Sequence, residues 1–424
     1  MSEIVLASPH GRDAVSVLRD PATIRRRCAA VTQAISEGRS ANFKLDRSRL
    51  DEVAARVERV TRAAYPELRI PFHSRWRHFA SGGIDRKASM DAQMADRSVA
   101  DQARARFDLT VVSVLLDAGA GPQWRYVEDG TGQTSSRSEG LGIASWHAFQ
   151  QGLFSSAPGD DPLRADAAAL QRLDASTLRR SFQVTPGNPL VGLEGRVALL
   201  NRLGAALAAD QGMAGRPSAL FDRLTQSASV SDGTAEVDAG QVLRAVLDAF
   251  SSIWLTGSML QGVPLGDVWP HRWAGGESKS EGGHGTTDGW VPFHKLSQWL
   301  SYSLLEPLIW SGAHVTGLDA LTGLPEYRNG GLLLDGGVIV PRDPRNLARR
   351  WTPADEFIVE WRALTVSLID ELAPLVRARL GKTAEEMPLA CILEGGTWAA
   401  GREIARELRD GSPPLSIDSD GTVF

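Results

Sequence analysis

Two short stretches of the chain carry residue types that could act on a sugar. The first, residues 293–298, reads Phe-His-Lys-Leu-Ser-Gln and supplies an ammonium group. The second, residues 321–331, reads Leu-Thr-Gly-Leu-Pro-Glu-Tyr-Arg-Asn-Gly-Gly and supplies a carboxylate, a phenol and a guanidinium. Such groups can bind a sugar phosphate and stabilise the positive charge of a transition state. A structural ion-pair network among Lys295, Glu326 and Arg328 is the alternative.

A basic and aromatic segment at residues 73–79, His-Ser-Arg-Trp-Arg-His-Phe, is the candidate for binding a phosphate. Guanidinium groups bind phosphate through charge-assisted, forked hydrogen bonds, so Arg75 and Arg77, with His73, are the predicted ligands. The interleaved tryptophan and phenylalanine indicate that the segment is fixed to the core, which leaves the basic side chains facing a cleft. A solvated basic loop is the alternative.

Two further carboxylates are candidates for contacting the substrate. Asp117 follows the apolar run 110–116, so it could point into a pocket, although an aspartate that caps a turn would look the same. Glu139 lies in residues 137–147, where a helix start is predicted, and is either a ligand or an ordinary first-turn glutamate. His147 is predicted to be a hydrogen-bonded helix histidine rather than a catalytic residue.

The glycine-rich stretch at residues 277–289 superficially resembles a phosphate-binding loop. Its lysine precedes the glycines and no strand leads into it, so it is not a Walker motif. We expect a plain surface loop here, with a flexible lid over a cleft as the alternative.

The composition is that of an ordinary soluble globular protein. The chain has 424 residues, of which 42% are hydrophobic and 23% charged, enough for a large core. A formal net charge of −5 argues against sequence-independent binding of nucleic acid, which needs a clustered basic surface. Two cysteines without metal-ligand spacing predict buried, reduced thiols and no zinc site. The sequence shows no signal or membrane-span pattern, so we expect a cytoplasmic protein. We also expect that it needs no cofactor or metal.

Hydrophobic periodicity predicts that helices position the candidate residues. Apolar residues recur at helical spacing in four stretches, and a helix start signal with proline opens a fifth. The predicted helices cover residues 21–38, 50–64, 193–207, 242–253 and 352–372. Pro374 is expected to bend or end the last of them.

Strand signals are fewer. Residues 110–116 are continuous and β-branched, which favours a buried strand, with a helix as the alternative. Apolar arms around Asp-Gly-Gly at residues 332–340 predict a short hairpin after Arg328. The predicted fold is therefore mainly α with small β elements. We expect a single catalytic domain over residues 1–424, on which an N-terminal helical part, about 1–70, packs.

Several long strings in one order resemble a known family. They lie at residues 73–79, 115–126 (Leu-Leu-Asp-Ala-Gly-Ala-Gly-Pro-Gln-Trp-Arg-Tyr), 137–141 (Arg-Ser-Glu-Gly-Leu) and 321–331. Together they resemble the uracil-catabolism family of bacteria and fungi, long filed as a domain of unknown function. The resemblance implies an enzyme of pyrimidine degradation.

A looser resemblance is to the queuosine-nucleotide salvage glycosidases. Their Phe-x-Lys-x-x-Gln and Leu-Thr-x-Phe-Ala-Asp-Tyr-Arg stretches match the windows around Lys295 and Glu326, with glutamate here in place of their catalytic aspartate. Asp117 matches an Asp-Ala pair, and Glu360 and Arg362 match a Glu-x-Arg pair. The resemblance implies a compact, helical, glycosidase-like domain with Glu326 in the catalytic position.

The function that these resemblances imply is hydrolysis of an N-glycosidic bond. In the route implied by the family, the pyrimidine ring is opened while attached to ribose, which leaves a ribosylurea or its 5′-phosphate. Glu326 and Lys295 are the predicted catalytic residues. The predicted substrate-binding residues are Asp117, Glu139, Tyr327, Arg328, Arg75, Arg77 and His73. We expect the catalytic residues, Asp117 and residues 137–141 to converge on one cleft.

Two other functions are compatible with the same residues. The chain could transfer ribose phosphate to an acceptor other than water, or it could be a non-catalytic partner of other uracil-catabolism enzymes. Long polar strings favour an enzyme, because a scaffold has little use for them. The expected ligand is a (phospho)ribosyl small molecule, with no nucleic acid and no membrane. The expected state is a monomer or a weak homodimer.

Overall fold

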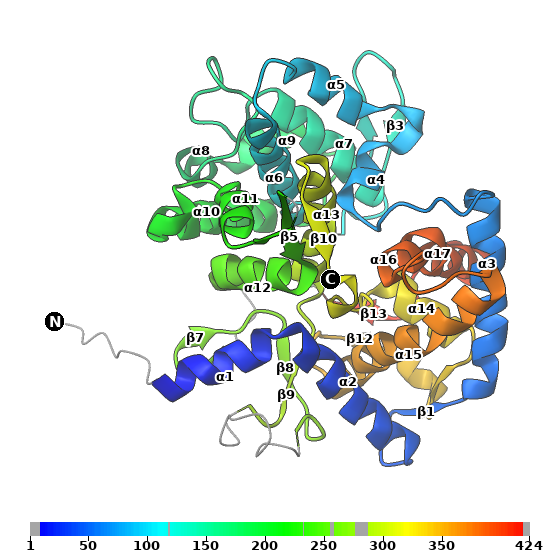
Figure 1. Cartoon of the computed structure of the whole chain (residues 1–424). Coiled ribbons are helices and arrows are strands. Elements are labelled where there is room, and N and C mark those ends of the chain that lie inside the picture. Colours follow the sequence, from blue (N-terminus) through cyan, green and yellow to red (C-terminus); the bar gives the residue numbers. More distant parts are fainter. Residues whose placement is uncertain (1–8, 118, 232, 255–257, 276–286, 419–424) are drawn as a thin grey trace. The chain divides into compact units, whose positions relative to one another are not determined.

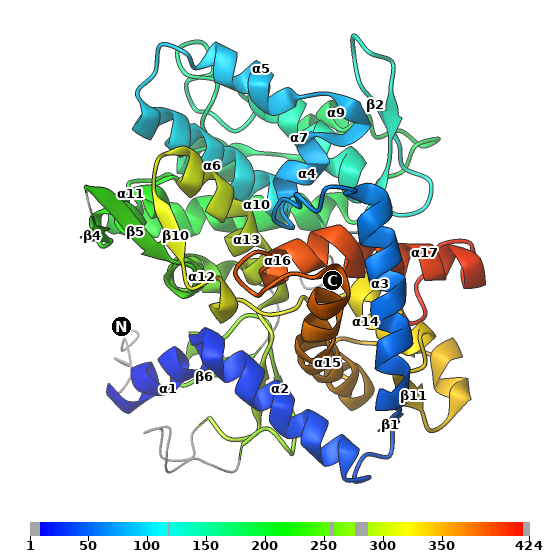
Figure 2. The same cartoon turned by 45° about the vertical axis from the view of Figure 1, so that its right-hand side comes forward.

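Helices dominate the structure, which is a computed structural model that describes residues 9–117, 119–231, 233–254, 258–275 and 287–418 (Figures 1 and 2). The strands are short and pair into sheets of two or three. The prediction of a mainly α fold with small β elements is therefore confirmed. Residues 277–286 of the predicted glycine-rich loop lie outside the described residues.

The chain divides into two compact units, each made of stretches that are far apart in the sequence. Unit 1 contains Met1–His73, Thr256–Gln298 and Leu318–Ser419. Unit 2 contains Ser74–Leu255, Trp299–Gly317 and Asp420–Phe424. No single linker separates two successive domains, and the single domain over residues 1–424 stays a prediction. The predicted N-terminal part falls in unit 1.

The core of unit 1 is built around α15 (Glu356–Leu380), which is buried on most of its surface. Helices α2 (Pro21–Ser36), α3 (Leu50–Ala64) and α14 (Tyr327–Asp335) pack against it (Figure 1). Gly330 permits the close approach of α14, because a Cβ there would lie 2.3 Å from the Trp361 ring. Pro374 lies inside α15 and does not end it, so that alternative was wrong.

Most of the remaining elements of unit 1 are short. The helices are α1 (Pro9–Arg19), η1 (Arg47–Arg49), η5 (Leu318–Ala320), η6 (Pro344–Ala348), α16 (Leu389–Ile392), η7 (Leu393–Thr397) and α17 (Trp398–Arg409). The strands are β1 (Phe43–Leu45), β6 (Met259–Leu260), β7 (Val263–Pro264), β8 (Val268–Pro270), β9 (Trp290–Pro292), β11 (Ile339–Pro341), β12 (Arg350–Trp351) and β13 (Ser416–Ile417). Helix α13 (Lys295–Trp310) begins in unit 1 and continues in unit 2.

The hairpin predicted at residues 332–340 is wrong. Leu332 to Asp335 are the end of α14, and the chain turns at Gly337, whose φ is 76°. Strand β11 then pairs antiparallel with β1, with Phe43 opposite Pro341. The glycines make a turn as predicted, but the apolar arm before them is helical and buried, in a helix that packs on α15 and α17.

The strand predicted at residues 110–116 is also wrong, because these residues end α6 (Val99–Leu115) of unit 2. Every residue from Phe107 to Leu115 is buried. A helix that is apolar on all sides shows no helical stripe, so its sequence resembles that of a buried strand.

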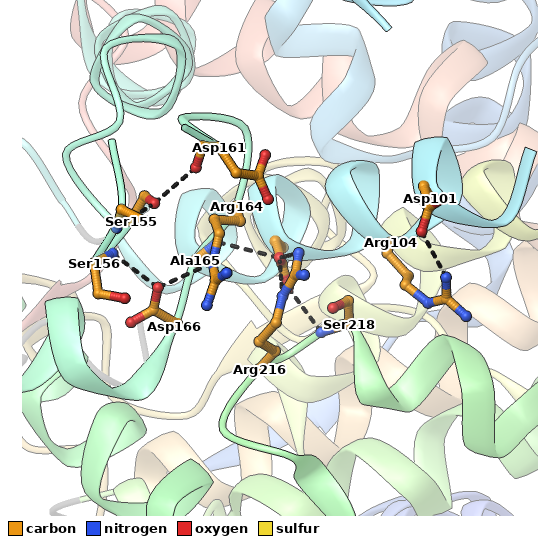
Figure 3. A network of polar contacts seen from close by, with 12 residues as sticks. Asp101, Arg104, Ser155, Ser156, Asp161, Arg164, Ala165, Asp166, Arg216 and Ser218 are labelled. Atoms are coloured by element: carbon orange, nitrogen blue, oxygen red, sulfur yellow. Dashed lines mark hydrogen bonds and ion pairs between the residues drawn. The ribbon is translucent and has the colours of Figure 1, made fainter. Parts of the chain in front are cut away.

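A buried carboxylate anchors α6 to two loops of unit 2. Asp108 accepts hydrogen bonds from Ala165 N (3.1 Å), Ser218 N (2.8 Å) and the Arg216 guanidinium (2.6 Å at Nη2). Figure 3 shows Ala165, Ser218 and Arg216, the residues that donate these hydrogen bonds. Burial raises the pKa of Asp108, and the charge of Arg216 opposes that shift. The network fixes α6, at whose C-terminal end Asp117 lies.

Unit 2 contains further helices and strands. The helices are α4 (Arg75–Phe79), η2 (Ser81–Gly83), α5 (Arg86–Gln93), α7 (Arg137–Gln150), α8 (Ala167–Arg172), α9 (Ala175–Ser181), α10 (Leu193–Ala209), η3 (Gln211–Met213), α11 (Ala219–Gln226), α12 (Ala239–Phe250) and η4 (Ser251–Ile253). The strands are β2 (Tyr126–Val127), β3 (Thr134–Ser135), β4 (Ser229–Ser231), β5 (Thr234–Asp238) and β10 (His314–Thr316). Helices α4, α6 and α7 lie side by side (Figure 2).

Candidate active site

The predicted site residues fall in both units. Unit 1 carries His73, Lys295, Glu326, Tyr327 and Arg328. Unit 2 carries Arg75, Arg77, Asp117 and Glu139. Their convergence on one cleft stays a prediction, but within each unit the side chains that fix them are defined.

In unit 1, reciprocal hydrogen bonds join the stretch that contains Lys295 to the stretch that contains Glu326. Gln298 Nε2 donates to Thr322 Oγ1 (2.7 Å), and Thr322 N donates to Gln298 Oε1 (2.8 Å). Gln298 Nε2 also donates to Phe293 O (3.0 Å). Both side chains are fully buried. The first turn of α13, which carries Lys295, is therefore fixed to the segment that leads into Glu326.

Lys295 is half-buried and is the first residue of α13. Its backbone N donates to Asp267 Oδ2 (2.9 Å). Asp267 also receives two hydrogen bonds from Arg362 (2.7 and 2.6 Å) and one from Trp269 Nε1 (2.6 Å). Burial alone would raise the pKa of Asp267, but the charge and hydrogen bonds of Arg362 lower it. A buried ion pair thus sets the position of Lys295.

Glu326 is the N-cap of α14 and is half-buried. Its Oε2 accepts a hydrogen bond from Arg328 N (2.7 Å) and its Oε1 one from Asn329 N (2.7 Å). The partial positive charge of a helix N-terminus favours a negative group there. The carboxylate is therefore held in place by the backbone. It has a structural role whether or not it is catalytic.

Tyr327 and Arg328 begin α14 and contact the C-terminal segment. Tyr327 Oη donates to Ile417 O (3.5 Å), and burial raises the pKa of Tyr327 to about 12. Arg328 Nη1 donates to Gly411 O (3.3 Å). Both contacts fix the C-terminal segment against α14.

His73 is buried and paired with a carboxylate that was not predicted. Its Nδ1 lies 2.8 Å from Glu394 Oε2, and Tyr65 Oη donates to Glu394 Oε1 (3.3 Å). Glu394 lies in η7, a single π-helical turn. Such turns occur frequently at functional sites.

Arg75 is fully buried at the start of α4, next to Asp117. Its Nη1 lies 3.1 Å from Asp117 Oδ1, and its Nε donates to Ser113 Oγ (2.7 Å). Burial lowers the pKa of Arg75, and the charges of Asp117 and Glu139 oppose that shift. Among the described residues, Arg75 Nη2 has no hydrogen-bond partner. The prediction that segment 73–79 is fixed to the core is confirmed, with Trp76 and Phe79 buried.

Arg77 is half-buried and forms an ion pair with Glu306 (Nη2 to Oε1, 2.6 Å). Ser74 Oγ donates to the other oxygen of Glu306. Arg75 and Arg77 therefore contact different carboxylates. A carboxylate neutralises the positive charge of each arginine. A phosphate would therefore have to bind beside that carboxylate or displace it.

Glu139 lies in the first turn of α7, whose N-cap is Ser136, so the predicted helix start is confirmed. His147, near the other end of α7, lies with its Nε2 2.7 Å from Glu128 Oε1. The prediction of a hydrogen-bonded helix histidine is confirmed. Glu128 also accepts two hydrogen bonds from Arg86 (2.8 and 2.6 Å).

Comparison with known proteins assigns nearly the whole chain to one family. Residues 17–424 match the family described as "Protein of unknown function (DUF1688)". The chain belongs to this family.

Two fungal proteins are similar over almost their full length to this DUF1688 member. "Uracil catabolism protein 4" of Lachancea kluyveri is 39% identical over 417 residues, with 92% of this chain and 93% of the relative covered. "Protein urg3" of Schizosaccharomyces pombe is 39% identical over 409 residues, with 95% and 96% covered. The predicted resemblance to the uracil-catabolism family is confirmed. The likeness to queuosine-nucleotide glycosidases stays a prediction.

Sequence reasoning missed several residues that position the candidate site of this DUF1688 protein. Arg196 on α10 donates to Leu116 O (3.0 Å) and Gly119 O (3.3 Å), on either side of Asp117, and burial lowers the pKa of Arg196 to about 10. Asp267 and Glu394 were missed as well. Each of these three residues lies far in the sequence from the residue it fixes. The Glu-x-Arg match identified Arg362, the ion-pair partner of Asp267, but not Asp267 itself.

One further cluster could hold a metal ion, formed by His271, Glu356 and Glu360 in unit 1. Within the described ranges, no helix has both the length and the apolar character needed to cross a membrane.

Proposed function

We propose that this DUF1688 protein acts in uracil catabolism as an N-glycoside hydrolase. Its substrate would be a ribosylurea or its 5′-phosphate, cleaved to urea and ribose or ribose phosphate. The name of the Lachancea kluyveri relative supports the pathway. The observation that carries the catalytic assignment is the Gln298–Thr322 pair, because it holds the Lys295 and Glu326 windows together.

The proposed reaction replaces the C1–N bond of the ribosyl group with a C1–O bond from water. Overall, the C1–N bond breaks and its bonding pair passes to the urea nitrogen, water supplies the oxygen that binds C1, and one proton of the water ends on that nitrogen. The transition state resembles an oxocarbenium ion, which a nearby carboxylate stabilises electrostatically. Glu326 is assigned this role, by stabilising the cation, attacking C1 or activating the water.

The environment of Glu326 supports this assignment. Backbone N–H groups hold both of its oxygens, and a carboxylate has about four lone-pair sites, so acceptor capacity remains for a substrate or water. A group that is already fixed needs little reorganisation during the reaction, which makes its electrostatic effect larger. The half-buried position leaves part of the side chain accessible.

The other predicted residues take supporting roles. Lys295 is assigned to orienting Glu326 or contacting the substrate, and Arg328, which also donates to Gly411 O, to holding its loop or a ribose hydroxyl. Asp117 and Glu139 would accept hydrogen bonds from urea and ribose, because urea offers several N–H donors. Arg77 is the better candidate for the phosphate, since its side chain is 27% exposed whereas that of Arg75 is fully buried.

A product assay tests the proposal and separates it from its rivals. The purified protein is incubated with ribosylurea or its 5′-phosphate, and urea and free sugar are quantified with and without added pyrophosphate or free base. A hydrolase releases equal amounts of urea and sugar without an acceptor. Release that requires an acceptor identifies a transferase. No release from either substrate under any condition contradicts the glycosidase assignment.

A further inference from the structure

Three side chains from two distant stretches of unit 1 gather in one place. His271 directly follows β8, and Glu356 and Glu360 lie one turn apart at the start of α15. Residues four apart on a helix lie on the same face, so both carboxylates are directed to one side of α15. One ligand atom of each of the three residues lies within 4.8 Å of the others.

The two buried members of this cluster lack hydrogen bonds at the atoms that face each other. The side chains of His271 and Glu360 are 0% exposed. Among the described residues, neither His271 Nε2 nor Glu360 Oε1 has a hydrogen-bond partner. They are 3.6 Å apart, too far for a good hydrogen bond. Buried polar atoms usually have hydrogen-bond partners, so an exception calls for an explanation, of which a bound ion is one.

We propose that His271, Glu356 and Glu360 bind a divalent transition-metal ion. His271 Nε2 lies 3.6 Å from Glu360 Oε1 and 3.8 Å from Glu356 Oε1. Two ligand atoms that share an ion at roughly 2.1 Å can be at most about 4.2 Å apart, so both separations can be bridged. The ion satisfies the two buried atoms that the protein leaves without partners.

The surroundings support such a site. Ser40 Oγ donates to Glu360 Oε2 (2.6 Å), which leaves Oε1 of that carboxylate to face His271. Hydrogen bonds of this kind orient metal ligands. The side chain of Glu356 is 45% exposed, so an ion can enter from that side. Arg272 Nη2 lies 2.9 Å from Glu356 Oε1 and competes with the ion for this oxygen.

One hydrogen bond of His271 disfavours metal binding at its Nε2. Trp273 N donates to His271 Nδ1 (3.3 Å), so a neutral imidazole carries its proton on Nε2, where the ion would bind. Metal binding therefore moves that proton to Nδ1 and breaks the Trp273 contact. A bond of this length is weak and is readily given up for a metal–nitrogen bond.

The ligand set selects the class of ion. One imidazole nitrogen and two carboxylate oxygens suit Zn²⁺ or Mn²⁺, whereas Mg²⁺ prefers oxygen ligands in near-octahedral geometry. The site would link the loop after β8 to α15. The Asp267–Arg362 pair joins the same two regions and positions Lys295. The ion is thus assigned a structural role, which does not depend on the proposed hydrolase activity.

Calorimetric titration of the full chain with ZnCl₂ and with MnCl₂, after removal of metals with a chelator, tests the site. We expect one equivalent of at least one of these ions to bind and to raise the melting temperature, with weaker binding of Mg²⁺. Glu356→Gln should weaken binding at least tenfold and keep the fold, because Glu356 is exposed. Arg272→Ala should tighten binding, because it removes the competing cation.

His314→Gln is the matched control. His314 Nδ1 lies 3.5 Å from Glu236 Oε1 in unit 2, an exposed His–Glu pair that belongs to no three-residue cluster among the described residues. This variant should bind the ion as the unchanged protein does. The proposal is overturned by the absence of saturable binding of both ions. It is equally overturned if Glu356→Gln leaves the affinity unchanged, or if His314→Gln weakens binding as much as Glu356→Gln.

Discussion

At the residue scale, three basic side chains of segment 73–79 already have carboxylate partners. Arg75 contacts Asp117, Arg77 contacts Glu306, and His73 contacts Glu394. A substrate must therefore add to these pairs or exchange with one member. Removing one partner of a buried pair leaves an unpaired charge, so substitutions at Arg75 affect stability as well as binding.

Arg77 offers the cleaner test of phosphate binding, since it is half-exposed. We expect Arg77→Ala to raise the KM for the phosphorylated substrate about tenfold or more, because a charge-assisted contact is lost. The KM for the nucleoside form should change little. Steady-state kinetics with both substrates measure the difference.

Arg97→Ala is a suitable control for that variant. Arg97 forms a similar ion pair with Asp161 in unit 2, and both side chains are about as exposed as that of Arg77 (29% and 30%). It should leave both KM values unchanged. Equal effects of Arg77→Ala on the two substrates would remove the phosphate role.

The sequence indicates which residues of the site are chemically capable but not what holds them. Glu326 and Lys295 were identified from two short strings. Asp267 accepts a hydrogen bond from the backbone N of Lys295, but it lies in no recognisable sequence motif. Such a partner comes from a distant stretch of chain, and local spacing carries no information about it.

At the element scale, the Gln298–Thr322 pair is what joins the start of α13 to the segment before α14. Thr322→Val keeps the shape of the side chain but removes the Oγ1 acceptor of Gln298 Nε2. We expect a loss of stability of roughly 1–2 kcal/mol. We also expect kcat/KM to fall at least tenfold, because small displacements of catalytic groups are costly. Chemical unfolding and kinetics measure the two effects.

Thr365→Val separates the two effects of that substitution. Thr365 is equally buried in unit 1, and its hydroxyl donates only to Trp361 O within α15 (2.8 Å) among the hydrogen bonds of the described residues. It should lose comparable stability but retain kcat/KM. If Thr322→Val is destabilised to the same extent and remains fully active, the pair does not position a catalytic site.

Apolar stripes predict helices that expose one face, whereas the mostly buried α15 was predicted with the help of its start signal. Helices α2, α3, α10 and α12 were predicted from apolar stripes. Helix α6 was not, because its C-terminal half is buried on all sides and shows no stripe. The apolar residues after Gly331 precede an Asp-Gly-Gly signal that is typical of a hairpin, but they are buried and end α14.

At the scale of the whole molecule, stability in acid depends on buried carboxylates. Burial opposes ionisation of Glu128, but hydrogen bonds from Arg86 and His147 lower its pKa from 4.5 to about 2. The unfolded chain therefore binds more protons between these two values. The contribution of Glu128 is fully present above pH 4.5 and is lost as the pH falls to about 2.

Glu128→Gln should remove this dependence on pH. At pH 7 we expect a loss of roughly 3–5 kcal/mol, because Arg86 stays buried without its charge partner. The difference from the unchanged protein should shrink between pH 4.5 and 2. Urea unfolding at several pH values measures it. Glu386→Gln, at an exposed glutamate, should change stability little, and equal losses in both variants would contradict the account.

The proposed function requires the carboxylate of Glu326 to act on the substrate. Glu326→Gln retains the volume but removes the charge and weakens the cap of α14, so a stability loss of roughly 0.5–2 kcal/mol is expected. Asp20→Asn, at the N-cap of α2 in the same unit, controls for this structural effect.

Urea release by Glu326→Gln, Glu326→Asp and Asp20→Asn is the most direct measurement. We expect a loss of about two to three orders of magnitude for Glu326→Gln, and more if Glu326 is the nucleophile. We expect intermediate activity for Glu326→Asp, which restores a carboxylate one methylene shorter, and unchanged turnover for Asp20→Asn. If folded Glu326→Gln turns over at the wild-type rate, the carboxylate is not catalytic and the glycosidase assignment fails.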